Sequence, residues 1–217
     1  MSPYELKIKL DMSDDRAKFV REHSMSDKIN AIVTDDWHMH FFDDEGNDIT
    51  NFVKKIEDYA FLDCKSLTSI SIPDSVTSIR KYAFCNCLSL TSISIPDSVK
   101  SIGSWAFNSC ENLTSIVIPD SVTSIGEWAF SWCTSLTNVI IPDSVTSIGE
   151  YAFVDCISLE SISIPDSVRS IGYNVFCWCS SLKSIVFKGK TLEEVKSMDF
   201  YPWGVEDKSI IKVEKKA

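Results

Sequence analysis

A 23-residue unit recurs without insertion or deletion from Ile56 to Ser170, and a sixth copy begins at Ile171. The second copy reads IRKYAFCNCLSLTSISIPDSVKS, and the other complete copies keep its apolar positions and its proline. A fixed period of roughly 20 to 50 residues is typical of a solenoid, in which each unit buries its apolar side chains only against neighbouring units. The period therefore predicts a stack of coils in which no single copy folds alone.

Each unit predicts one short strand, one turn and a second extended piece. In LTSISIP, Leu67 and Ile70 are expected to face inward, while Ser69 and Ser71 alternate outward. Proline and aspartate in IPDS favour a turn, and VTSIG then runs toward the next coil. The inward residues expected in the second copy are Ile79, Ala83, Phe84, Cys87, Leu90, Ile93, Ile95 and Val99.

This unit resembles the BspA-type subfamily of leucine-rich repeats, whose core reads IG-x-x-AF-x-x-C-x-x-L-x-x-I-x-IP-x-x-V-x-x. The match covers residues 56–187. The resemblance implies a β-rich solenoid, a leucine-rich repeat array with short parallel strands. It also implies binding of other proteins, with extracellular or cell-surface adhesion in many members.

The two flanking regions lack the repeat and are expected to cap it. Residues 1–55 predict an α+β cap: Ser13 begins a helix, and INAIVT, WHMHFF and ITNFV are strands. Residues 188–217 predict a cap that contains a helix, because Thr191 and Glu194 form a capping box. The apolar residues Ile210, Ile211 and Val213 are expected to return as a final strand.

Charge and targeting signals limit the function. The net charge is −10, and residues 56–187, with 6 basic and 13 acidic residues, carry −7 of it. This balance argues against direct binding of nucleic acid and leaves a basic protein partner open. The amino terminus shows no apolar secretory stretch and no membrane span is present, so the chain as given is expected to stay in the cytoplasm. Removal of a leader from a longer precursor would instead indicate a surface or secreted protein.

The eight cysteines are expected to be free thiols. Six of them recur at one repeat position, where parallel stacking gives a poor disulfide geometry. Zinc shared by the pairs Cys85/Cys87 and Cys177/Cys179 is excluded by the predicted distance between their coils, roughly 20 Å. Cys85 and Cys177 are interpreted as variation at an outer position.

No catalytic, metal or cofactor site is predicted. The repeats contain no histidine, so a Ser-His-Asp arrangement is not available within the array. His38 and His40 form an H-x-H pair that leaves a metal-dependent activity as a third, unfavoured hypothesis, since closed metal sites need three or four ligands. The aspartate of each IPDS segment, from Asp74 to Asp166, is interpreted as a turn residue rather than a calcium ligand.

Two surfaces are candidates for binding a partner. The strand rows place the apolar residues Val117 and Ile140 among small polar ones, for which both a recognition patch and ordinary strand-forming substitution remain open. A second row has one aromatic residue per coil, for which both stacking between coils and partner contact remain open. The candidate partner-binding residues are Ser92, Ser115, Val117, Asn138, Ile140, Ser161, Trp105, Trp128, Tyr151 and Trp132.

The sequence thus favours a non-enzymatic scaffold that binds another protein, either as a BspA-like adhesion module or as an intracellular inhibitor. In the second hypothesis, which includes a phage-borne origin, the acidic array would block a basic nucleic-acid-binding enzyme. Neither the partner nor the oligomeric state follows from the sequence.

Overall fold

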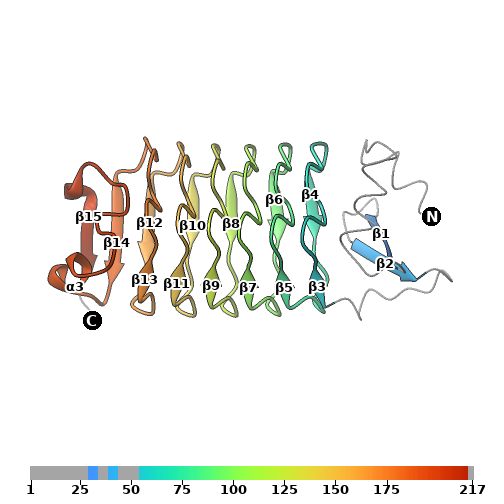
Figure 1. Cartoon of the computed structure of the whole chain (residues 1–217), viewed down its shortest axis with the longest axis horizontal. Coiled ribbons are helices and arrows are strands. Elements are labelled where there is room, and N and C mark those ends of the chain that lie inside the picture. Colours follow the sequence, from blue (N-terminus) through green and yellow to red (C-terminus); the bar gives the residue numbers. More distant parts are fainter. Residues whose placement is uncertain (1–28, 34–38, 44–53, 215–217) are drawn as a thin grey trace.

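The repeats form a stack of short coils with their strands side by side (Figure 1). The computed structural model describes the backbone of residues 29–33 and 39–43 and all atoms of residues 54–214. The predicted solenoid is confirmed, because equivalent strands of successive coils pair in parallel at a constant register of 23 residues.

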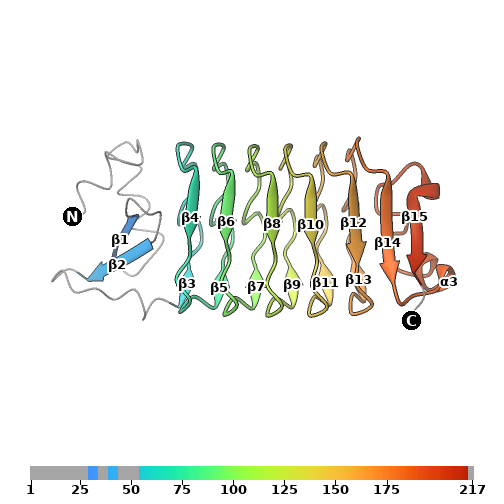
Figure 2. The same ribbon diagram turned by 180° about the vertical axis from the view of Figure 1, so that it is seen from behind.

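Two ladders of strands run along the array (Figures 1 and 2). The first ladder is a six-stranded sheet of two-residue strands, and its order follows the chain. Its members are β3 (Lys55–Ile56), β5 (Ser78–Ile79), β7 (Ser101–Ile102), β9 (Ser124–Ile125), β11 (Ser147–Ile148) and β13 (Ser170–Ile171).

The second ladder consists of the strands equivalent to LTSISIP together with the carboxyl-terminal strand, and it is divided into two sheets. β4 (Ser69–Ser71) pairs with β6 (Ser92–Ser94). A separate five-stranded sheet contains β8 (Ser115–Val117), β10 (Asn138–Ile140), β12 (Ser161–Ile164), β14 (Ser184–Lys188) and β15 (Ile211–Glu214).

The interior is built from columns of identical residues, one from each coil. The buried phenylalanine rings stack in parallel, with centroid distances from 5.0 to 6.1 Å. Leucine, alanine, isoleucine and cysteine form similar columns around them. Seven of the eight inward residues expected in the second copy are buried, and Ile93 is the exception, because it packs against the core while staying partly exposed.

The segment of each coil that carries the Ala-Phe pair and the column cysteine, such as residues 82–87, is called the return side here. Its backbone conformation was not predicted from the sequence. Two residues per coil adopt positive φ, for example Trp128 at 56° and Trp132 at 59°. Hydrogen bonds join this side to the next coil, as from Phe61 N–H to the Ala83 carbonyl at 2.7 Å. The second of these two positions carries aspartate or asparagine in three coils, at Asp63, Asn86 and Asp155. These residues could have indicated positive φ, because aspartate and asparagine are enriched in that conformation.

Residues 188–214 add a further coil that closes the carboxyl end. The predicted helix is α3 (Leu192–Lys196), and Thr191 and Glu194 form both bonds of the capping box. After the 3-10 helix at Lys208–Ile210, the predicted final strand β15 pairs in parallel with β14. The Lys190 ammonium is buried and binds the Asp166 carbonyl at 2.8 Å and its carboxylate at 3.2 Å.

Two of the expected amino-terminal strands are present, since β1 (Ile29–Val33) pairs antiparallel with β2 (Met39–Asp43). The helix expected from Ser13 and the strand ITNFV lie outside the described residues. Among the helices described, none is long and apolar enough to cross a bilayer.

Candidate functional site: the strand face and the aromatic face

The strand face brings the predicted apolar pair together. Val117 in β8 is directly opposite Ile140 in β10, and their side chains are 67% and 57% exposed. The neighbouring row joins Ser115, Asn138 and Ser161, which are all exposed. Two adjacent aliphatic side chains therefore project from a surface of small polar ones.

Ser92 lies apart from this continuous sheet. It begins β6, which pairs with β4 and not with β8, although it remains exposed. The continuous part of the strand face therefore begins at β8. We define the strand face as the outward residues of β8, β10 and β12, centred on Val117 and Ile140.

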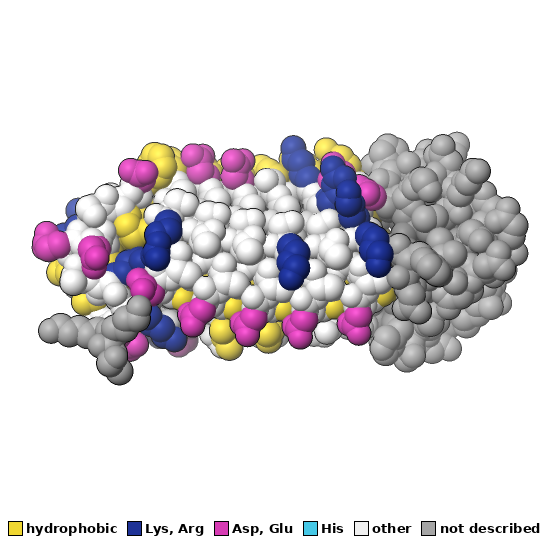
Figure 3. Space-filling view, turned by 90° about the horizontal axis from the view of Figure 1, so that it is seen from below, with side chains coloured by type: hydrophobic (Ala, Val, Ile, Leu, Met, Phe, Trp, Pro, Cys, Tyr) yellow, Lys and Arg dark blue, Asp and Glu magenta, His cyan; other side chains and the backbone are white. Residues whose placement is uncertain are grey.

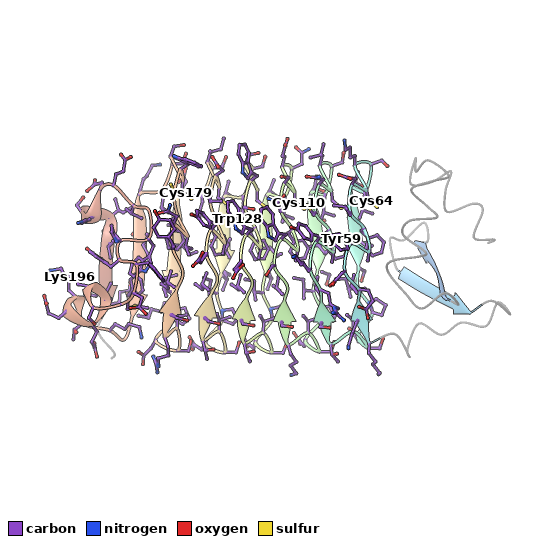
Figure 4. All side chains as sticks on the ribbon, viewed as in Figure 1. Tyr59, Cys64, Cys110, Trp128, Cys179 and Lys196 are labelled. Carbon is purple, nitrogen blue, oxygen red and sulfur yellow. The ribbon has the colours of Figure 1, made fainter. Side chains whose placement is uncertain are left out.

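The row of one aromatic per coil is a continuous stack on the return side of the array. Trp105 and Trp128 have ring centroids 4.6 Å apart, and Trp128 and Tyr151 have centroids 4.3 Å apart. These three residues are only partly exposed because each ring covers the next. Figure 4 labels two members of the row, Tyr59 and Trp128, which lie in different coils at a similar height in the view.

Trp132 belongs to a different position and stands free of that stack. Its side chain is 48% exposed. Its neighbours in the same column are Ser109 and Asp155, whose short side chains do not cover an indole. The aromatic candidates thus divide into a stack that stabilises neighbouring coils and an exposed tryptophan that is available for contact.

The thiols show why the cysteine column is structural. All eight cysteines are free, and seven are buried. From Cys87 to Cys179, each column thiol donates to a phenylalanine carbonyl of the preceding coil, as from Cys133 to Phe107 at 3.2 Å. Figure 4 labels Cys64, Cys110 and Cys179 in this column.

The interpretation of Cys85 as a residue at an outer position is wrong, because its side chain faces the core and not the solvent. Its side chain is only 5% exposed, and the thiol donates to the Asn108 amide oxygen at 3.4 Å. Asn108 and Ser131 are buried at the same position and are joined by a hydrogen bond of 2.5 Å. Cys177, in contrast, is partly exposed.

Burial of these thiols predicts a loss of stability at alkaline pH. Burial raises the pKa of Cys133 to about 12, from an ordinary value of 9.0. Below pH 9 both folded and unfolded thiols are protonated; above it only the unfolded thiol ionises, so the stabilisation is lost as the pH rises toward 12. Each such thiol should lower the free energy of unfolding by about 1.4 kcal/mol per pH unit above 9. Urea unfolding at pH 8 and pH 10.5 measures this.

The variant Cys133→Ala is the control for that measurement. It removes one titrating thiol, so its stability should fall less steeply between the two pH values. An identical pH dependence in the variant and the wild type would contradict the contribution of Cys133.

Acidic side chains follow an edge of the array. Figure 3 shows them at regular intervals there, beside a broad area that is mostly neither charged nor apolar and carries a few lysine or arginine side chains. The turn aspartates Asp74, Asp97, Asp120 and Asp143 are exposed, and the turn itself is closed by a backbone bond such as Val76 N–H to the Pro73 carbonyl.

Within the described part of the chain, no three His, Cys, Asp or Glu side chains converge as metal ligands. His38 lies outside the described residues, and only the backbone of His40 is described. The H-x-H hypothesis therefore stays a prediction from sequence.

Known proteins that are similar to this chain in sequence and structure share this architecture. The family described as "BspA type Leucine rich repeat region" matches residues 45–120 and 106–213 in six copies. The chain belongs to this family. The match continues through residues 188–213, in accord with the closing coil formed by β14 and β15.

Two solved structures share recognisable sequence with the chain. A leucine-rich repeat protein of T. pallidum is 28% identical with a TM-score of 0.56, over 74% of this chain and 90% of that one. A leucine rich cell surface protein of Faecalibacterium prausnitzii is 30% identical with a TM-score of 0.50, over 76% of this chain. This chain spans about half of the latter protein, 54% of its length.

The pneumococcal vaccine antigen PcpA shares the fold at 18% identity and a TM-score of 0.57, over 76% of this chain and 40% of that one. No curated protein matches the chain. Family and fold together identify a protein-interaction scaffold of the leucine-rich repeat class.

Proposed function

We propose that the protein is an adhesion or interaction module that binds a partner protein through the strand face. The observation that carries this proposal is the exposed aliphatic pair Val117 and Ile140, which lie opposite each other in paired strands. Single exposed apolar residues are common on protein surfaces, but adjacent ones rimmed by polar groups are typical of interaction sites.

The flanking residues support a protein partner. Ser115, Asn138 and Ser161 leave the surface shallow and supply hydrogen-bonding groups around the apolar centre. Three other coils carry serine where Val117 and Ile140 stand, at Ser71, Ser94 and Ser163, and the sixth copy carries Val186. The apolar pair therefore distinguishes the middle of the array from its neighbours, and the repeat itself does not require it.

A surface location is part of the proposal. Its support is the family and the F. prausnitzii relative described as a cell surface protein. The acidic turn row favours a partner with basic groups near the strand face.

Photo-crosslinking tests the proposal with the full chain. A benzophenone amino acid replaces Val117 in one sample and the exposed Thr123, which precedes β9 in the other ladder, in the control. Each protein is incubated with a cell-surface and extracellular-matrix extract and, separately, with a cytosolic extract. We expect a defined adduct at position 117 with the surface extract and none at position 123.

Two results would contradict the proposal. An adduct that forms at position 123 alone would place binding on the other ladder. A single adduct with a basic nucleic-acid-binding enzyme from the cytosolic extract would contradict adhesion and support the inhibitor hypothesis.

A further inference from the structure

The last repeat and the closing coil separate beside Trp178. In each of the five preceding coils, the N–H group at the repeat position of Trp178 donates to a carbonyl of the next coil, as from Asp155 to Cys177 at 3.0 Å. The closing coil keeps the bond that precedes it, from Phe176 N–H to the Trp203 carbonyl at 3.0 Å. Among the described residues, Trp178 N–H makes no bond to the closing coil. The two coils are therefore bonded as far as Phe176 and diverge after it.

This divergence uncovers the ends of two buried columns. Leu182 is partly exposed, whereas the leucines at the same position of the other five coils are completely buried. Cys179 is 9% exposed, and the other thiols of its column are at most 2% exposed. A cavity of about 330 Å³ lies here, and Figure 4 labels Cys179 in its wall. Both coils line it, with Phe176, Trp178 and Leu182 from the last repeat and Val205, Glu206 and Ile210 from the closing coil.

The cavity combines an apolar floor with an acidic rim. Phe176 and Val205 are buried at its base, while Trp178, 68% exposed, and Glu206 reach the solvent. Asp207 also lies in the wall, where it caps the 3-10 helix. No lysine or arginine lines the cavity. An apolar pocket with few polar groups at its mouth is typical of a binding site, and these polar groups attract a cation.

The carboxylate of Glu206 is available to a cation from outside the chain. Within the described residues it forms no ion pair, and the neighbouring lysines are engaged elsewhere. Lys183 pairs with Glu160 at 3.6 Å, and the Lys208 ammonium lies 5.8 Å from the centre of the Tyr201 ring. A cation that binds beside the apolar wall displaces water, which strengthens its attraction to the carboxylate.

We propose that this cavity binds a basic side chain, lysine or arginine, of a partner protein. Both side chains have an aliphatic stem that packs on Leu182 and Ile210, and a positive end that reaches Glu206 at the rim. The Trp178 indole adds a favourable contact with the cation. Ligand pockets usually have volumes of roughly 300 to 1,000 Å³, so a cavity at the lower limit suits one side chain. The inference rests on the proposed function of binding a protein, but it uses a surface other than the strand face.

The test measures binding of small probes to the full chain. Acetyl-Gly-Lys-Gly-amide and its arginine counterpart are titrated while NMR follows the indole N–H signal of Trp178, which Trp178→Phe assigns. The norleucine peptide keeps the aliphatic stem of lysine and lacks its charge. We expect both basic peptides to shift the signal and the norleucine peptide to bind roughly tenfold more weakly.

Alkylation provides a second measurement. Cys177 lines the cavity and is partly exposed, whereas the other seven thiols are buried, so an alkylating reagent should modify Cys177 first in the folded chain. A bound basic peptide should slow this modification, and the norleucine peptide at the same concentration should slow it less.

Matched variants assign the effect to the cavity. Glu206→Gln keeps the shape of an exposed side chain and should weaken binding of the basic peptides roughly tenfold. Glu127→Gln removes an exposed carboxylate in the fourth coil, outside the cavity, and should leave binding unchanged. Equal binding of the lysine and norleucine peptides, wild-type binding by Glu206→Gln, or no saturable shift of the Trp178 signal would overturn the proposal. The variant Val117→Ser/Ile140→Ser should bind the peptides normally, so failure of the cavity and failure of the strand face give different results.

Discussion

Replacing Trp203 by alanine is expected to lower the free energy of unfolding by about 3 to 5 kcal/mol, the range for a large buried aromatic side chain. Trp203 is completely buried in the closing coil. Its ring lies 5.3 Å from Phe187 between centroids, and its indole N–H donates to the Asp199 carbonyl at 2.9 Å. Urea denaturation followed by circular dichroism measures the change.

The loss should be greatest at the carboxyl end of the array. The Trp203 carbonyl accepts a bond from Phe176 N–H at 3.0 Å, so the tryptophan joins the closing coil to the last repeat. Because each solenoid unit is stabilised by its neighbours, hydrogen exchange should accelerate first in β14 and β15. The control Trp178→Ala removes an exposed ring and should cost less than about 1 kcal/mol. Equal losses in the two variants would contradict the closing role of Trp203.

Replacing Gly149 by alanine is expected to cost about 1 to 3 kcal/mol, the usual range for overpacking. A Cβ atom at Gly149 would lie 2.5 Å from the Glu127 nitrogen and 2.7 Å from the Gly126 carbonyl carbon. These are backbone atoms of the preceding coil, so relief requires the coils to move apart. The lower entropy of an unfolded chain with alanine would offset only about 0.4 to 1 kcal/mol.

The second coil provides a matched control for this glycine. Arg80 stands at the same repeat position and forms exposed ion pairs with Glu57 at 3.0 Å and Asp58 at 3.2 Å. Arg80→Ala should therefore change the free energy of unfolding by less than about 1 kcal/mol. A Gly149→Ala variant as stable as the wild type would contradict the tight spacing of the coils.

Most of the fold was predictable because one spacing determines the position of every strand. The period places Leu67 and Ile70 inside, and the capping box at Thr191 and Glu194 predicts the start of α3; both predictions are confirmed. The return side was not predictable in the same way. Tyrosine and tryptophan seldom adopt positive φ, and only bonding between coils makes this conformation regular in the array.

The sequence predicts which residues of the candidate site are neighbours, but it does not predict which of them are exposed. The period alone indicates that Val117 and Ile140 are neighbours, and their strand register confirms it. Whether an aromatic side chain is covered depends on the residues one coil before and one coil after it. Trp128 is covered because Trp105 and Tyr151 stack on it, whereas Trp132 has small neighbours.

The affinity of the partner captured at position 117 for the wild type and for Val117→Ser/Ile140→Ser tests the central proposal most directly. These substitutions restore the serine of other coils, so the array should keep its stability. We predict that the double variant unfolds at the wild-type urea concentration and binds the partner at least tenfold more weakly. Unchanged affinity in a folded double variant would contradict binding through the strand face.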